Sequence, residues 1–147
     1  MKTDDFLAQI DEARVAEAVR AAERRTSGEV RVFVSRCPLR GRAADARAQE
    51  EFRRLDMVST TERNGVLFYL VPADQAFAVV GDDAVHAKCG AAFWAELAGA
   101  MEQDFARSDF TAGLVAGIAR AGELLAAHFP RHDDDRNELP DGIAHDW

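Results

Sequence analysis

The sequence predicts an α/β protein, a three-layer α/β/α sandwich around a small mixed sheet. Two uncharged segments rich in β-branched and aromatic residues, Val66–Val71 and Ala76–Val80, are joined by a short turn at Pro72–Gln75. Strands that are apolar on both faces belong in the middle of a sheet covered by helices. The segments before and after this hairpin show helical periodicity, so we expect them to supply that cover.

Length and charge limit the classes of function. A chain of 147 residues suits a single domain, and its net charge of −8 argues against nucleic acid as a partner, because binding it needs a basic face. A cation suits an acidic protein better. We therefore expect a cation as one partner and no nucleic acid, although acidic soluble proteins are common and most of this charge can be solvated surface.

The cysteines and the apolar segments predict where the chain resides. Cys37 and Cys89 lie far apart without metal-type spacing, which favours reduced thiols in a cytoplasmic protein. The first residues lack the apolar run of a signal peptide. The weakly polar stretch Phe110–Phe129 carries Arg120 and Glu123, so it does not predict a membrane span. We expect a soluble, cytoplasmic monomer without a direct membrane span.

The N-terminal third predicts a helix followed by a strand. Apolar or small residues recur on one face over Asp5–Arg25, which predicts a helix. Thr26, Ser27 and Gly28 end it, since glycine is the usual residue just past a helix end. Over Glu29–Ser35 the valines alternate with charged, aromatic and polar residues, which predicts the first strand.

The next segment completes a βαβ unit. Cys37–Gly41 reads as a loop, and Arg42–Leu55 as a charged, mostly solvent-facing helix. A strand, a crossover helix and a second strand form a right-handed unit with parallel strands. The first strand should therefore lie parallel to Val66–Val71, and Ala76–Val80 should return antiparallel to it.

Two further helices follow the hairpin, over about His86–Phe105 and Phe110–Phe129. The second carries Gly113, Gly117 and Ala121, spaced by four. Each glycine costs a helix roughly 1 kcal/mol relative to alanine. We therefore expect this row to permit close approach of another helix or of the sheet.

The end of the chain differs in composition from what precedes it. Residues 131–147 contain six acidic residues and two arginines. We predict a domain over residues 1–130 and an acidic C-terminal tail over 131–147, docked through Leu139, Ile143 and Trp147.

The topology brings polar residues from distant parts of the sequence to one edge of the sheet. The first two strands begin at this edge and the third ends there, so Glu29, Asn64, Asp82 and Asp83 should meet. Carboxylates, amides and backbone carbonyls are the oxygen ligands that calcium prefers. The sequence therefore predicts a site for calcium, or for magnesium in its place, on these four residues. The alternative is a surface ion network in which Arg63 pairs with Glu29 or Asp82.

Four segments and one tryptophan, in this order, resemble a known family. They are Thr26–Val32, Arg63–Leu67, Val80–Asp82, Trp94, and Phe105–Ile118 with the spacing of its phenylalanines and glycines. They resemble the TPM-domain family, often labelled TPM phosphatase, over about residues 5–130. Relatives include thylakoid-lumen phosphatase-like and photosystem-repair proteins. The ending at His128–Pro130 and Asn137–Asp141 is similar to that of small soluble bacterial members.

The resemblance implies an α/β/α sandwich, divalent-cation binding with calcium, and an acid-phosphatase label. The first hypothesis is a non-catalytic or weakly catalytic cation-binding module, acting as an adaptor at a protein or membrane complex or in quality control. The alternative is a phosphatase acting on phosphate monoesters, in which a cation activates water and Arg63 binds the phosphate. A third interpretation is a scaffold that docks partners through Trp147 and the acidic tail.

Overall fold

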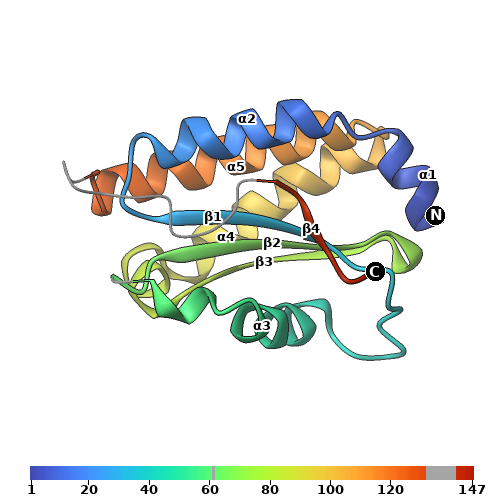
Figure 1. Ribbon diagram of the computed structural model, residues 1–147, viewed down its shortest axis with the longest axis horizontal. Helices are drawn as coiled ribbons and strands as arrows, with labels where there is room; N and C mark the ends of the chain where they lie inside the picture. Colours follow the sequence, from blue (N-terminus) through green and yellow to red (C-terminus); the bar gives the residue numbers. More distant parts are fainter. Residues whose placement is uncertain (61, 132–141) are drawn as a thin grey trace.

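A computed structural model describes residues 1–60, 62–131 and 142–147, and it confirms the predicted α/β sandwich (Figure 1). Its sheet has four strands in the order β3-β2-β1-β4. The strands are β1 at Glu29–Val34, β2 at Gly65–Val71, β3 at Ala76–Gly81 and β4 at Ala144–His145. β1 and β2 are parallel and β2 and β3 antiparallel, so the predicted βαβ unit and hairpin are both present.

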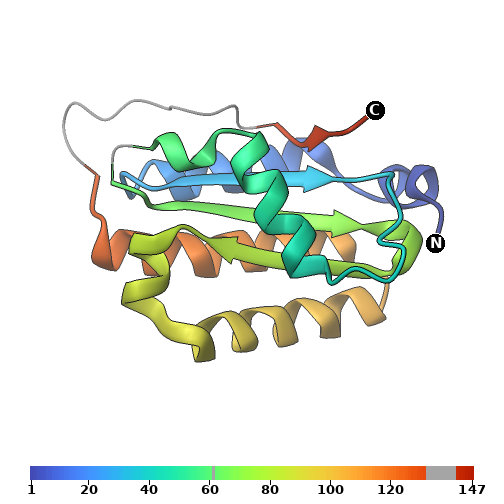
Figure 2. The ribbon, with the colours of Figure 1, turned by 90° about the horizontal axis from the view of Figure 1, so that it is seen from below.

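Helices cover both faces of the sheet. Their bounds are α1 Thr3–Ala8, α2 Glu12–Glu23, α3 Ala44–Arg54, α4 Asp83–Ala106 and α5 Phe110–His128; short 3-10 turns, η1 and η2, occupy Met57–Ser59 and Pro72–Asp74. α2, α4 and α5 lie on one face and α3 on the other (Figures 1 and 2). β2 is buried along its whole length, as its lack of charge predicts.

Each face of the sheet has its own apolar core. On the side of α2, α4 and α5, Phe68 packs with side chains such as Leu97 and Ile118. On the side of α3, Phe33 stacks on Tyr69 at 5.6 Å between ring centroids, beside Phe52. The period-two alternation of β1 and β2 divides their side chains between these two cores.

The predicted N-terminal helix is two helices, and the prediction of a single one was wrong. The chain leaves helical geometry between α1 and α2, where the Asp11 carboxylate caps α2 by accepting the Arg14 N–H at 3.1 Å. The Asp11 N–H donates in turn to the Thr111 hydroxyl of α5 at 3.0 Å. These two bonds make α2 begin at Glu12, within the segment that was predicted to be one helix. Ile10, between the two helices, is buried.

α4 begins earlier than expected. Asp82 caps it, so residues 83–85, which the sequence analysis placed before the helix, form its first turn. Gly90 then interrupts the helix with φ 74° and ψ 172°, a backbone conformation that side chains rarely adopt.

Close packing explains the row of small residues on α5. A Cβ on Gly117 would lie 2.8 Å from the Met101 sulfur of α4 and 3.2 Å from the Phe68 ring of β2. A Cβ on Gly113 would lie 2.7 Å from the Phe105 ring. The prediction of a close approach is therefore confirmed for both a helix and the sheet.

α5 is the one described helix long and apolar enough to cross a membrane by length and composition. The core helix of a soluble protein passes the same test. In this fold α5 packs against α2 and α4 and buries residues such as Leu114 and Leu125.

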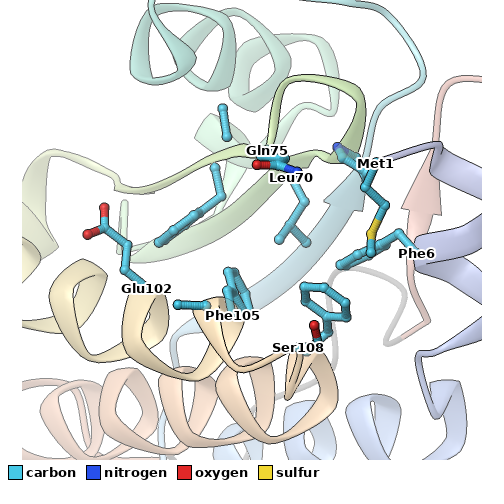
Figure 3. A pocket seen from close by; sticks show the side chains of 12 residues that line it. Met1, Phe6, Leu70, Gln75, Glu102, Phe105 and Ser108 are labelled. Atoms are coloured by element: carbon cyan, nitrogen blue, oxygen red, sulfur yellow. The ribbon is translucent and has the colours of Figure 1, made fainter.

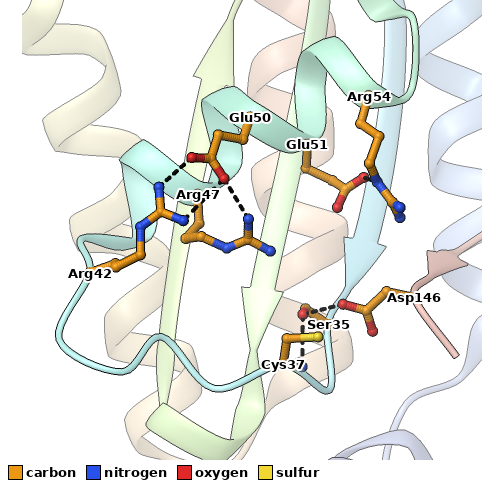
Figure 4. Close-up of polar contacts among 8 residues, drawn as sticks. All are labelled: Ser35, Cys37, Arg42, Arg47, Glu50, Glu51, Arg54 and Asp146. Carbon is orange, nitrogen blue, oxygen red and sulfur yellow. Dashed lines mark hydrogen bonds and ion pairs between the residues drawn. The ribbon is translucent and has the colours of Figure 1, made fainter.

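The last described residues add an edge strand that the sequence analysis did not predict. In β4, Ala144 lies opposite Phe33 and His145 opposite Val34, in parallel register. Asp146 then accepts the Arg36 N–H at 2.9 Å and bonds the Ser35 hydroxyl (Figure 4).

Side chains reinforce this docking. The Arg36 guanidinium lies 4.4 Å from the centre of the Trp147 ring, a cation–π contact. Of the three predicted anchors, Ile143 packs against the core, Trp147 stacks on His145, and Leu139 lies outside the described residues. The boundary at residue 130 stays a prediction.

Acid should release this segment. Burial by itself would raise the pKa of Asp146, but hydrogen bonds from Ser35, Arg36 and Cys37 lower it below the usual 3.8. Ionised Asp146 therefore stabilises docking above pH 3.8, and this contribution is lost as the pH falls below 3.8. We expect the indole NMR signal of Trp147 to hold its position down to about pH 4 and to move below it.

The matched variant is Asp146→Asn, which keeps the side-chain shape without a titrating charge. Its Trp147 signal should show the undocked position already at neutral pH. A wild-type transition centred well above pH 4 would contradict the lowered pKa.

Candidate functional site

The ends of β1, β2 and β3 meet where the hairpin opens. Residues 27–29, 62–65 and 81–83 form the polar edge of the sheet at this end. Glu29 at the start of β1 lies opposite Gly65 at the start of β2, and Val66 lies opposite Gly81 at the end of β3. The Asp82 N–H donates to the Gly65 carbonyl at 2.9 Å and so extends the pairing past the strand. The predicted convergence of these segments is confirmed.

Arg63 and Asp82 form the centre of this edge. The Arg63 Nε and Nη2 atoms donate to the two carboxylate oxygens of Asp82 at 2.8 and 2.9 Å, a bidentate pair. Asp82 is 5% exposed, and its Oδ1 also accepts the Asp83 N–H at 2.8 Å. The hydrogen bonds and charge of Asp82 raise the pKa of Arg63 above its usual value.

Asp83 joins the same guanidinium from the solvent side. Its Oδ2 lies 3.4 Å from the Arg63 Nη2, and its side chain is 91% exposed. Arg63 itself is 47% exposed and adopts a left-handed backbone conformation, with φ 53°. This arrangement places one buried and one exposed carboxylate around a single, partly exposed cation.

A second polar cluster lies on the β1 side of the edge. The Ser27 hydroxyl donates to Glu62 at 2.7 Å. The Asn64 side-chain amide donates to Ser27 at 3.0 Å and to Glu62 at 3.3 Å. Gly28 permits this contact between chains, since a Cβ there would lie 3.1 Å from the Asn64 carbonyl.

The sequence-predicted residues are therefore divided between the two clusters. Arg63, Asp82 and Asp83 are in direct contact, as the ion-network alternative expects for Arg63 and Asp82. Asn64 is buried and directs its amide to Ser27 and Glu62, while Glu29 is buried at 3% exposure. Ser27 and Glu62 are not among the ligands that the sequence analysis named.

The polar edge offers few ligands to a divalent cation. In residues 1–60, 62–131 and 142–147, no group of three or more His, Cys, Asp or Glu side chains is arranged to hold a metal. Asp82 and Asp83 alone offer two carboxylates, and magnesium is commonly held by one or two with water completing the shell. A cation would compete with Arg63 for the oxygens of Asp82. The edge therefore fits a weak, exchangeable site and not a preformed cage.

A separate ion network lies on α3 (Figure 4). Glu50 bonds both Arg42 and Arg47, and hydrogen bonds from these two arginines lower its pKa to about 2. Glu51 is buried and pairs with exposed Arg54 at 2.7 Å. Since Glu50 is satisfied by two arginines and Glu51 by one, the network reads as helix-surface stabilisation.

The fold and its site define a class of protein and then a family. A four-stranded mixed sheet between helical layers, with an arginine–aspartate pair at the open end of its hairpin, is an α/β/α sandwich with a polar edge. A family model described as the TPM domain matches residues 1–124. The chain belongs to the TPM domain family.

A solved structure supports the same fold. The chain is similar to the NMR structure of BA42 protein from the psychrophilic bacterium Bizionia argentinensis, with 36% sequence identity and a TM-score of 0.83. The similarity covers 92% of each chain. A comparison with curated proteins gave no match.

Proposed function

We propose that this TPM-type chain is a divalent-cation-binding module, non-catalytic or weakly catalytic, which takes calcium or magnesium at the polar edge. The observation that carries the proposal is the pair of carboxylates, Asp82 and Asp83, that face the same exposed guanidinium. Asn64 and Glu29, which the sequence analysis also named as ligands, lie at the same edge but outside this carboxylate pair. An adaptor or quality-control role, with a protein or a membrane complex as partner in the cytoplasm, is part of the same proposal.

Arg63 acts in this proposal as a counter-ion that a metal replaces. Without a cation, its guanidinium neutralises Asp82, which would otherwise be a buried, uncompensated charge. Because Arg63 is 47% exposed, its side chain can turn into solvent when a cation takes its place. The competition predicts weak binding, with a Kd of about 0.1–1 mM, the range of low-affinity calcium modules.

The phosphatase alternative places greater demands on Arg63. It needs a guanidinium held in position for a phosphate, whereas Arg63 is bonded to Asp82 through two nitrogens and, once a cation displaces it, would turn into solvent. We therefore propose cation binding in preference to phosphate-ester hydrolysis.

Calorimetric titration with calcium and with magnesium tests the proposal. Asp83→Asn is the informative variant, because the 91% exposed side chain can lose its charge without disturbing the core. We expect it to weaken binding at least threefold, as befits one ligand of a solvent-exposed site. Asp82→Ala is less informative, since it also removes the cap of α4.

Asp5→Asn is the matched control, an exposed aspartate of α1 changed in the same way. It should bind the cation as the wild type does. Absence of heat with either ion, at protein concentrations that detect millimolar binding, would rule out the site. Equal weakening by both variants would show a net-charge effect and not a site.

A further inference from the structure

A second feature lies at the other end of the sheet, beside the turn that joins β2 and β3. A cavity of about 380 Å³ opens there between the turn, α1 and the connection from α4 to α5 (Figure 3). Its volume falls within the range of small-molecule sites, which is about 300–1,000 Å³. The polar edge lies at the opposite end of the hairpin, and the cavity shares no lining residue with it.

Four phenylalanine rings line the cavity, those of Phe6, Phe77, Phe105 and Phe110. They form a continuous row, with ring centroids 5.1 Å apart for Phe77 and Phe105, 5.8 Å for Phe105 and Phe110, and 5.0 Å for Phe110 and Phe6. The face of an aromatic ring carries negative charge density and attracts cations. The row thus supplies both an apolar surface and a preference for positive charge.

One acidic side chain completes the lining. Glu102 of α4 is exposed, and within the described part of the chain no ion pair or side-chain hydrogen bond engages its carboxylate. Figure 3 shows this carboxylate on one side of the cavity, with the Met1 nitrogen on the opposite side. A ligand with a positive charge toward Glu102 and an apolar body along the phenylalanines would match both the carboxylate and the rings.

We propose that this cavity binds a small organic cation with an apolar body, such as an aryl-alkyl or alkyl ammonium compound. The ammonium group pairs with Glu102 and lies near the rings of Phe77 and Phe105, while the body contacts Phe6 and Phe110. An anionic ligand of the same shape is repelled by Glu102 and by the ring faces and can pair only with the Met1 nitrogen on the opposite side, so it binds less well. A neutral ligand gains the apolar contacts only.

Three probes of one shape and different charge test the proposal: 3-phenylpropylamine, 3-phenylpropanol and 3-phenylpropanoate. The full chain is titrated with each while the backbone amide NMR signals are followed. We expect the amine to shift signals of β3 and of the α4–α5 connection. We also expect it to bind at least fivefold more tightly than the alcohol, and the alcohol more tightly than the acid.

Two variants locate the effect. Glu102→Gln should reduce the preference for the amine over the alcohol to the part that the ring faces supply. Glu96→Gln, a change of the same kind on the same helix away from the cavity, should leave the preference intact. Ala106→Phe fills the cavity from an exposed position and should weaken all three probes at least tenfold.

Failure has a distinct form. Absence of binding by all three probes, equal binding of amine and acid, or signal shifts confined to the polar edge would each overturn the proposal. Asp83→Asn should leave amine binding unchanged, so the outcome does not depend on the cation site proposed above. A shift of the same signals with protein concentration alone would instead show that a second copy of the chain fills the cavity, and would also overturn it.

Discussion

Replacing Arg63 with alanine is expected to lower the free energy of unfolding by about 2–3 kcal/mol in the absence of divalent cations. Asp82 is 5% exposed and receives two hydrogen bonds from Arg63. Among the described residues, the variant therefore leaves this buried carboxylate with the Asp83 N–H as its remaining donor. The loss of a partner from a fully buried ion pair costs about 3–5 kcal/mol. We expect less here because Arg63 is 47% exposed. Urea unfolding in a chelating buffer measures the difference.

The effect of calcium on the Arg63→Ala variant tests the proposed function. If the cation and Arg63 compete for the same carboxylates, 5 mM calcium should restore about 1 kcal/mol or more of the loss in Arg63→Ala, since binding to the native state alone stabilises it. The variant should also bind calcium more tightly than the wild type. A loss of stability that calcium does not relieve would show a purely structural ion pair, and would contradict the proposed function.

Arg20→Ala serves as the control. Arg20 pairs with Glu17 at 3.0 Å, but both side chains are about half exposed. An exposed pair of this kind contributes about 0.2–1 kcal/mol. The control should therefore lose little stability, and calcium should not change that loss.

Much of the fold could be predicted because its signals are local or follow from connectivity. The uncharged segment in β2 marked a central strand, and the helix between β1 and β2 fixed them as parallel. The same topology predicted that the ends of β1, β2 and β3 lie together at the open end of the hairpin, but not how their side chains pair. The directions of the strands alone decide which of their ends lie side by side.

The features that were missed depend on tertiary contacts. β4 has two residues, and its place on β1 is fixed by the bonds of Asp146 to Ser35 and Arg36, which no local pattern shows. The break between α1 and α2 similarly depends on the contact of Asp11 with Thr111, one hundred residues away. Neither partner could be identified from periodicity.

The pairing of side chains within the site could not be predicted from the sequence either. Arg63 could have turned to Glu29 or to Asp82, and its left-handed backbone conformation and the cap of α4 decide for Asp82. The cavity was missed for another reason. An apolar ring on a helix can fill a core or line a hollow, and only the packing distinguishes the two.

Gly122 lies where α2 and α5 cross. Gly122→Val should destabilise the protein by about 3 kcal/mol, at the upper end of the cost of overpacking. A Cβ at Gly122 would lie 2.8 Å from the Ala22 Cβ and 3.2 Å from its Cα. Ala22 has no flexible side chain to move aside, so the two helices themselves must separate. Thermal unfolding followed by circular dichroism measures the loss.

Gly99→Val is the matched control, because Gly99 also lies within a helix, α4, and has open space where a Cβ would be. Valine has a somewhat higher helix propensity than glycine, so this variant should be neutral or stabilising by a few tenths of a kcal/mol, roughly. The contrast separates packing from propensity, which both variants change alike. If Gly122→Val unfolded at the wild-type temperature, the close approach of α2 and α5 would be wrong. If both variants lost stability equally, backbone freedom and not packing would explain the glycines of these helices.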